Sequence, residues 1–187
     1  MGARVARLAR ILTTRRERCV TGMHTTGVTS RLNGAIQLPD GTHIRGRGRR
    51  EGLPDGPLPE FGLYLGRSRG LPRRASARRA AEQEPAWPAV WLDWPDFRTP
   101  RDPRAAAAVI KQAYGRARAG ERVEVACGGG TGRTGTVLAC MAILAGHPAG
   151  DAVAWTRRHY RARAVETPGQ RRWVGWFAAL ETLDGPS

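Results

Sequence analysis

One stretch of the chain decides the fold: residues 122–134 read RVEVACGGGTGRT. Residues 122–126 alternate as a strand does and run directly into a turn that is rich in glycine. The apolar residues from Thr134 to Ala145 then predict a helix that stops at Gly146. A strand, a glycine-rich turn and an apolar helix, in that order, form the general layout of a phosphate-binding loop.

The glycines of this turn suit the binding of a phosphate group. Glycine tolerates positive φ, so successive backbone N–H groups can converge on one point. The N-terminus of the following helix directs its free N–H groups and its positive dipole end to the same point. The Arg133 side chain can hold two phosphate oxygens at once. The predicted phosphate-binding residues are Gly128, Gly129, Gly130, Thr131, Gly132 and Arg133.

Two further side chains make the predicted loop reactive. Cys127 ends the strand, where the helix dipole and the N–H groups favour its thiolate form. A thiolate at that place can attack phosphorus and form a cysteinyl-phosphate. Thr134 can donate its hydroxyl to the sulfur and stabilise it as it leaves during hydrolysis. We therefore predict that Cys127, Arg133 and Thr134 are catalytic.

Two alternative interpretations of the turn explain less. A nucleotide-binding P-loop has the pattern Gly-x4-Gly-Lys-Ser/Thr, but Cys127 stands at its first glycine and Arg133 at its lysine. A glycine-rich turn that merely contains a buried cysteine would leave the order of cysteine, glycines, arginine and threonine to chance. The sequence therefore favours a reactive phosphate site.

Three motifs in the right order resemble those of a known family. Residues 125–136 resemble the Cys-x5-Arg-Ser/Thr signature of the protein-tyrosine and dual-specificity phosphatase superfamily. Residues 94–97, WPDF, resemble its mobile Trp-Pro-Asp loop, and residues 166–170, ETPGQ, resemble its glutamine loop. The chain shows no counterpart of the tyrosine recognition loop of the large tyrosine-specific enzymes. Its compact length is closer to dual-specificity or atypical bacterial members.

This resemblance implies roles for two more residues. Asp96 is expected to protonate the leaving oxygen and later to activate water, whereas Gln170 is expected to orient that water. Alone, Asp96 would be interpreted as a turn residue and Gln170 as an exposed residue in the first turn of the last helix. Asp93 is a second candidate for the general acid. The family pattern places the acid directly after Pro95, so we interpret Asp93 as a loop residue without a catalytic role. Trp94 and Pro95 are expected to help the loop to close.

The chain also departs from the family pattern. Ala126 stands where the family usually has a histidine that organises the loop, and Glu166 replaces the first glutamine of the third motif. These departures leave open an alternative function, that of a catalytically weak phosphoprotein-binding module with the same fold.

Composition excludes several classes of protein. The net charge is +15, yet the arginines are dispersed and match no helix-turn-helix, zinc-finger or RNA-binding pattern, so the charge favours anionic substrates over nucleic acid. No stretch is apolar enough to span a membrane. Three scattered cysteines and four histidines without ligand spacing predict neither disulfides nor a metal. We expect a cytoplasmic phosphatase without cofactors that acts on a phosphorylated protein or a small phosphoester.

Strands that alternate with helices predict an α/β fold, with a central and mostly parallel sheet covered by helices on its faces. We expect a single catalytic domain at residues 31–187 and a poorly ordered basic arm at residues 1–30, for which a mitochondrial presequence or a start at Met23 are alternatives. Residues 66–84 are expected to form a flexible loop or an exposed helix. The predicted strands are 33–38, 43–47, 61–65, 89–92 and 122–126. Strand 89–92 is expected to be buried, with Trp91 in the core. The predicted helices are 103–119, with Asp102 as its N-cap, 134–145, 149–160 and 168–183.

Overall fold

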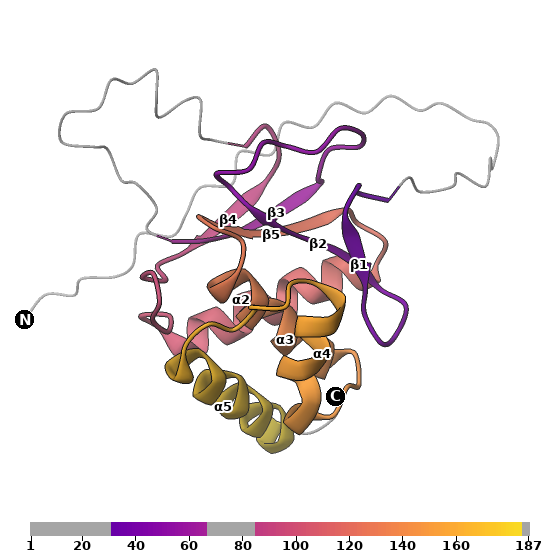
Figure 1. Cartoon of the computed structure of the whole chain (residues 1–187). Helices are drawn as coiled ribbons and strands as arrows, with labels where there is room; N and C mark the ends of the chain where they lie inside the picture. The colour runs from indigo at the N-terminus through magenta and orange to yellow at the C-terminus, as the bar shows by residue number, and fades with distance from the viewer. Residues whose placement is uncertain (1–30, 67–84, 185–187) are drawn as a thin grey trace, which may run out of the picture.

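The computed structural model describes residues 31–66 and 85–184, and these form a five-stranded sheet with four α-helices (Figure 1). The strand order is β1-β2-β5-β3-β4. The hairpin of β1 and β2 is antiparallel, and the other three pairings are parallel. The strands are β1 Ala35–Gln37, β2 His43–Gly48, β3 Phe61–Leu65, β4 Ala89–Leu92 and β5 Val123–Cys127. The prediction of a mostly parallel sheet is confirmed.

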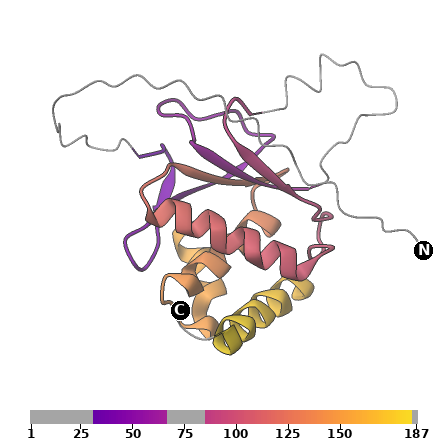
Figure 2. The ribbon, with the colours of Figure 1, turned by 180° about the vertical axis from the view of Figure 1, so that it is seen from behind.

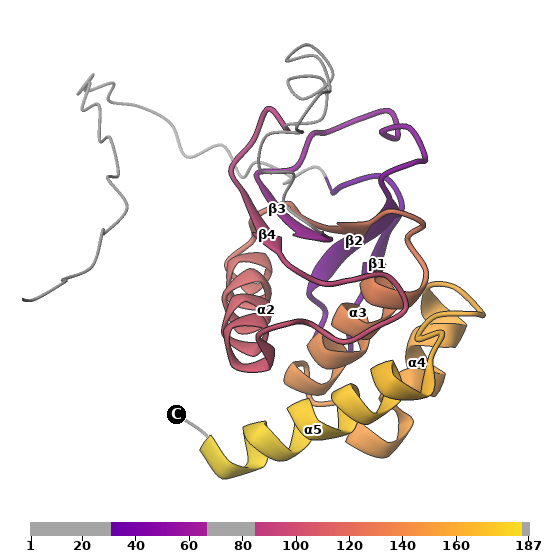
Figure 3. The ribbon, with the colours of Figure 1, turned by 90° about the vertical axis from the view of Figure 1, so that its left-hand side faces the viewer.

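The helices of the described part of the chain gather on one face of this sheet, as the opposite views in Figures 1 and 2 show. The sequence led us to expect helices on both faces of the sheet, but the described helices cover this face only. Figure 3 shows α5 at the outer side of the helical layer, with α3 between it and the sheet. The helices are α2 Pro103–Arg118, α3 Gly132–Leu144, α4 Ala152–His159 and α5 Pro168–Asp184, and the short 3-10 helix η1 Ala149–Asp151 precedes α4.

The core lies between the sheet and these helices. Successive residues of a strand point to opposite faces, so Val123, Val125 and Cys127 of β5 face the helices. On the other side of the core, α3 contributes Val137, Leu138 and Met141, all fully buried. Because α3 lies at the centre of the helical layer, almost every residue along it is apolar or small.

The opposite face of the sheet carries a buried cluster of charges that the sequence did not predict. The Glu124 carboxylate of β5 accepts hydrogen bonds from Nε of Arg45 at 2.8 Å and from Nε of Arg47 at 3.0 Å, both on β2. Tyr64 of β3 donates to the same carboxylate at 3.2 Å. This cluster explains why none of the described helices packs here, since a helix would need an apolar face to cover.

We expected β4 to be a buried strand, but most of it is partly exposed. It lies at the edge of the sheet, and only Leu92 of its four residues is buried. Trp91, which we expected in the core, is half-buried on the charged face, 4.9 Å from the Tyr64 ring and beneath the guanidinium of Arg49. An edge strand has a neighbour on one side only, so its side chains remain partly exposed.

Most helix boundaries agree with the sequence to within a few residues. Asp102 caps α2 by accepting a hydrogen bond from Ala105 N at 3.0 Å, as predicted. Helix α3 begins at Gly132, two residues before its predicted start, because the glycine-rich turn closes directly into the first helical turn. The predictions for residues 1–30 and for most of 66–84 lie outside the described residues.

Candidate active site

The sulfur of Cys127 lies at the carboxyl end of the central strand β5, where the glycine-rich loop begins. The side chain is buried, and Sγ accepts a hydrogen bond from Gly130 N at 3.1 Å. Arg133 follows in the first turn of α3 and is also buried. The loop between them therefore folds back over the sulfur and forms a cradle of backbone N–H groups.

Gly130 of the loop has no room for a side chain. Its φ is 72°, and a Cβ there would lie 2.5 Å from Gly48 N. A Cβ on Gly132 would meet the carboxylate of Glu166, whose exposed side chain can move away. Glycine is thus required at position 130, both for its backbone conformation and for close packing.

Arg133 connects the phosphate loop to the loop that follows β4. Its Nη1 donates to the Trp94 carbonyl at 3.0 Å, and its Nη2 lies 2.9 Å from Oδ1 of Asp96. Its Nε is buried and has no hydrogen-bond partner among the described residues. The guanidinium thus holds the Trp-Pro-Asp segment over the phosphate loop and keeps one buried donor for another acceptor.

The two candidate carboxylates of this segment differ in their surroundings. Asp96 reaches Arg133, whereas Asp93 pairs with the exposed Arg101 at 3.3 Å. Trp94 between them is fully buried, donates from its indole to the Arg98 carbonyl at 2.7 Å, and packs against the Trp173 ring of α5. The buried indole anchors the segment so that Asp96, and not Asp93, faces the phosphate loop.

Gln170 is fully buried, so the alternative of an exposed residue in the first turn of α5 is wrong. Its Oε1 accepts hydrogen bonds from Glu166 N at 2.9 Å and from Thr167 N at 3.3 Å, and its amide group lies beside Gly132. Nε2 has no partner among the described residues, and neither does the buried hydroxyl of Thr134. Buried donors without partners are costly, so their concentration around this loop indicates a site for acceptor atoms.

The sequence did not predict the side chains that hold the loop from outside. The Tyr160 hydroxyl donates to the Gly130 carbonyl at 2.5 Å, and Nη1 of Arg161 donates to the Gly129 carbonyl at 3.0 Å. Glu51 forms an ion pair with Arg161 at 2.7 Å. These residues come from the segment after α4 and the loop after β2, and no local pattern marks them as part of the site.

Shallow basic grooves lie beside the Trp-Pro-Asp segment and the segment after α4, and one of them reaches Thr131 of the phosphate loop. The largest, about 900 Å³, lies between the segment after β4 and the start of α5, and its lining includes the exposed Phe97 and the arginines Arg98 and Arg172. Two smaller grooves of about 400 and 450 Å³ continue along Arg163 and Glu166. The mouth of the site is thus open and mainly cationic.

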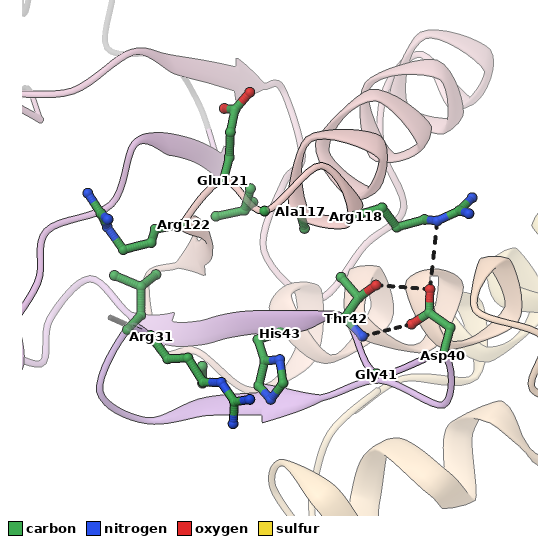
Figure 4. A pocket seen from close by; sticks show the side chains of 13 residues that line it. Arg31, Asp40, Gly41, Thr42, His43, Ala117, Arg118, Glu121 and Arg122 are labelled. Atoms are coloured by element: carbon green, nitrogen blue, oxygen red, sulfur yellow. Dashed lines mark hydrogen bonds and ion pairs between the residues drawn. The ribbon is translucent and has the colours of Figure 1, made fainter. Parts of the chain in front are cut away.

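A separate pocket of about 830 Å³ lies at the amino ends of β2 and β5, opposite the phosphate loop. Figure 4 shows that it lies between the β1–β2 hairpin and the end of α2, where Asp40 contacts Thr42 and Arg118.

Among the described residues, no group of three or more histidine, cysteine or acidic side chains could hold a metal ion. None of the described helices meets the length and hydropathy that a membrane span requires.

Comparisons with known proteins identify a related family and a similar fold. A family model described as "Swiss Army Knife protein, DSP-PTPase phosphatase domain" matches residues 78–173, which include Asp96, Cys127, Arg133 and Gln170. The crystal structure of Tk-PTP in the active form is 22% identical, with a TM-score of 0.56 over 79% of this chain and 97% of that chain. A structure of kinase associated phosphatase is 12% identical, with a TM-score of 0.55 over 81% of this chain and 98% of that chain. No curated protein sequence matches significantly.

Proposed function

Because the chain belongs to the DSP-PTPase phosphatase domain family of Swiss Army Knife proteins, we propose that it hydrolyses phosphotyrosine or related phosphomonoesters through a cysteinyl-phosphate. One observation carries the proposal: Arg133 contacts both Trp94 and Asp96 while it forms part of the phosphate loop. The cradle, the nucleophile and an acid therefore meet at one place, as hydrolysis by this route requires.

In the first step, the Cys127 thiolate attacks phosphorus and the bond from phosphorus to the ester oxygen breaks. The loop N–H groups and Arg133 hold the non-bridging oxygens, and the free Nε of Arg133 is available for one of them. As the guanidinium turns to the phosphate, it releases Asp96, which takes up a proton from solvent and then gives it to the leaving oxygen.

In the second step, water attacks the phosphocysteine, and the bond from phosphorus to sulfur breaks. Asp96 takes a proton from the water, and the free Nε2 of Gln170 offers a hydrogen bond that orients it. The buried hydroxyl of Thr134 is available to the departing sulfur. The products are inorganic phosphate and the regenerated thiolate, so no redox partner is needed, although a reducing compartment would keep Cys127 active.

The grooves beside the loop support an anionic substrate. The side chains of Arg98, Arg163 and Arg172 are exposed, and none of these side chains has a hydrogen-bond or ion-pair partner among the described residues. Uncompensated positive charge near an open site attracts anionic ligands. We therefore infer that the substrate is a phosphorylated protein or a small phosphoester that carries further negative charge.

A second candidate is a phosphoprotein-binding module that turns over slowly. Ala126 favours it, because no histidine precedes the nucleophile. Phosphate release from an aryl phosphomonoester separates the two candidates when the full chain is compared with its Cys127→Ser and Asp96→Ala variants. Cys140→Ala serves as a control, because that cysteine is buried in the core of α3 and takes no part in the reaction.

The two candidates predict different results. Hydrolysis requires release by the wild-type chain and the Cys140→Ala variant, background release by Cys127→Ser, and strongly reduced release by Asp96→Ala. If the wild-type chain and Cys127→Ser release phosphate at the same background rate while both bind orthovanadate, the binding module is the correct function.

A further inference from the structure

The four carbonyls that begin the phosphate loop are all held outward. The Cys127 and Gly128 carbonyls accept hydrogen bonds from Arg49 N at 2.7 Å and Arg50 N at 3.1 Å, which extend the pairing of β2 with β5. The chain after β2 then turns away, and two side chains replace it. Nη1 of Arg161 donates to the Gly129 carbonyl at 3.0 Å, and the Tyr160 hydroxyl donates to the Gly130 carbonyl at 2.5 Å.

Each outward carbonyl fixes an inward N–H group. The described residues contain no cis peptide bond, so the carbonyl and the N–H of one peptide unit point in opposite directions. In the unit that joins Gly129 to Gly130, Arg161 holds the carbonyl, and the N–H donates to Sγ of Cys127 at 3.1 Å. Arg161 therefore acts on the nucleophile through a single rigid peptide plane. Tyr160 orients the next unit, which carries the N–H of Thr131, in the same way.

Arg161 is itself fixed and charged. Its Nη2 donates to both carboxylate oxygens of Glu51, at 2.9 and 2.7 Å, and Glu51 also accepts a hydrogen bond from Gly48 N at 3.2 Å. The hydrogen bond from Arg161 is the main cause that lowers the pKa of Glu51. The hydrogen bond to Glu51, and to a lesser extent the charge of Cys127, raise the pKa of Arg161, so a positive charge persists behind the loop.

We propose that Arg161, held by Glu51, is a positioning residue that aims the Gly129–Gly130 peptide N–H at the Cys127 thiolate and supports its negative charge. The proposal rests on the proposed role of Cys127 as the nucleophile. In this role Arg161 would also help to order the loop, which in the family is done by a histidine at the position of Ala126. Tyr160 contributes to the same alignment without charge.

The first experiment compares Arg161→Met with Arg161→Lys and with the control Arg158→Met. Methionine keeps an unbranched side chain, and lysine keeps the charge and a donor group. Arg158 is an exposed residue of α4 whose side chain has no hydrogen-bond or ion-pair partner among the described residues. The measured quantities are kcat and KM for an aryl phosphomonoester, the ultraviolet absorbance of the Cys127 thiolate at neutral pH relative to Cys127→Ser, and the binding of orthovanadate.

We expect Arg161→Met to lower kcat about 10- to 100-fold, somewhat less than the loss of a whole oxyanion donor, and to reduce the thiolate absorbance. Arg161→Lys recovers part of both, and Arg158→Met behaves as wild type. Glu51→Gln causes a smaller loss, and adds little to Arg161→Met, because the two residues act as one unit. Tyr160→Phe, which keeps the ring, lowers kcat less than Arg161→Met does.

Two outcomes would overturn the inference. One is an active Arg161→Met variant with unchanged kcat and thiolate absorbance. The other is a loss of activity in which lysine recovers nothing and the thiolate absorbance stays at its wild-type value, which means that Arg161 serves stability alone. If the wild-type chain releases no phosphate at all, the proposed function fails, and the thiolate absorbance and orthovanadate binding still decide the role of Arg161.

Discussion

The carboxylate of Asp96 and the guanidinium of Arg133 form an ion pair of 2.9 Å between the loop after β4 and the first turn of α3. Both groups are needed for hydrolysis, but for different partners: Arg133 for the phosphate oxygens and Asp96 for the leaving oxygen. A phosphate group must therefore displace Asp96 from Arg133 before either residue can act. Binding and catalysis depend in opposite ways on the same carboxylate.

Asp96→Ala is expected to separate the two effects. Without its general acid, the enzyme should lose about 10²- to 10⁴-fold in kcat for substrates with poor leaving groups, and less for activated aryl esters. Orthovanadate should bind more tightly, because Arg133 no longer has a competing anion. Steady-state kinetics with a series of leaving groups and calorimetry test both. Asp93→Ala is the control, since that residue pairs with Arg101, and equal losses in both variants would contradict the assignment of Asp96.

Gly130→Ala is expected to abolish orthovanadate binding. The added Cβ meets the backbone at Gly48 at 2.5 Å, and φ at this position is 72°, so the loop must shift away from Cys127. Gly146→Ala is the matched control, because Gly146 also has a positive φ, 88°, but open space around its Cβ. Calorimetry and thermal unfolding should show backbone strain in both variants and loss of binding in Gly130→Ala alone. Normal binding by Gly130→Ala would show that the loop tolerates a side chain.

The sequence predicted the site where its chemistry is local. Cys127, the glycines and Arg133 are consecutive, so residue type and order were sufficient to predict a strand, a cradle and a helix at this place. The resemblance placed Asp96 on a nearby loop, and the structure brings it to Arg133. Its catalytic role, like that of Gln170, remains a prediction.

The sequence could not predict contacts that depend on the folded sheet. Glu51 and Arg161 meet only because the loop after β2 and the segment after α4 approach the same turn from opposite sides. The sequence also did not predict that Glu124 is buried. In a strand of five residues, a charged residue between apolar ones fits the alternation of a strand with one exposed face. Its partners Arg45 and Arg47 belong to a strand that precedes it by more than 70 residues.

The buried cluster around Glu124 predicts loss of stability in acid. Burial alone would raise the pKa of Glu124, but the hydrogen bonds and charges of Arg47 and Arg45 outweigh it and lower the pKa below its ordinary value of 4.5. A carboxyl group whose pKa is lower in the folded chain than in the unfolded chain stabilises the fold at pH values above its pKa in the unfolded chain. This stabilisation is lost as the pH falls through the pKa of the group in the folded chain. Thermal unfolding should therefore occur at progressively lower temperature as the pH falls below 4.5.

Glu124→Gln tests the same cluster at neutral pH. It leaves two buried guanidinium groups without a counter-charge, at a cost of about 3–5 kcal/mol in the free energy of unfolding. Glu60→Gln is the control, since Glu60 pairs with Arg122 at the surface, and its loss should stay within about 1 kcal/mol. Denaturant unfolding measures both, and similar small losses would mean that water reaches the Glu124 cluster.

Gln170→Ala is expected to change the rate-limiting step. If Nε2 of Gln170 orients the attacking water, its removal should slow hydrolysis of the phosphocysteine about tenfold, as the loss of one hydrogen bond worth about 1.4 kcal/mol implies, and leave its formation unaffected. Stopped-flow measurements should then show a burst of leaving group, equal to the enzyme concentration, before a slow steady state. Gln112→Ala, an exposed glutamine on α2, should show wild-type kinetics. A Gln170→Ala variant that loses burst and steady state alike would instead place Gln170 in the packing of Gly132, against which its side chain lies.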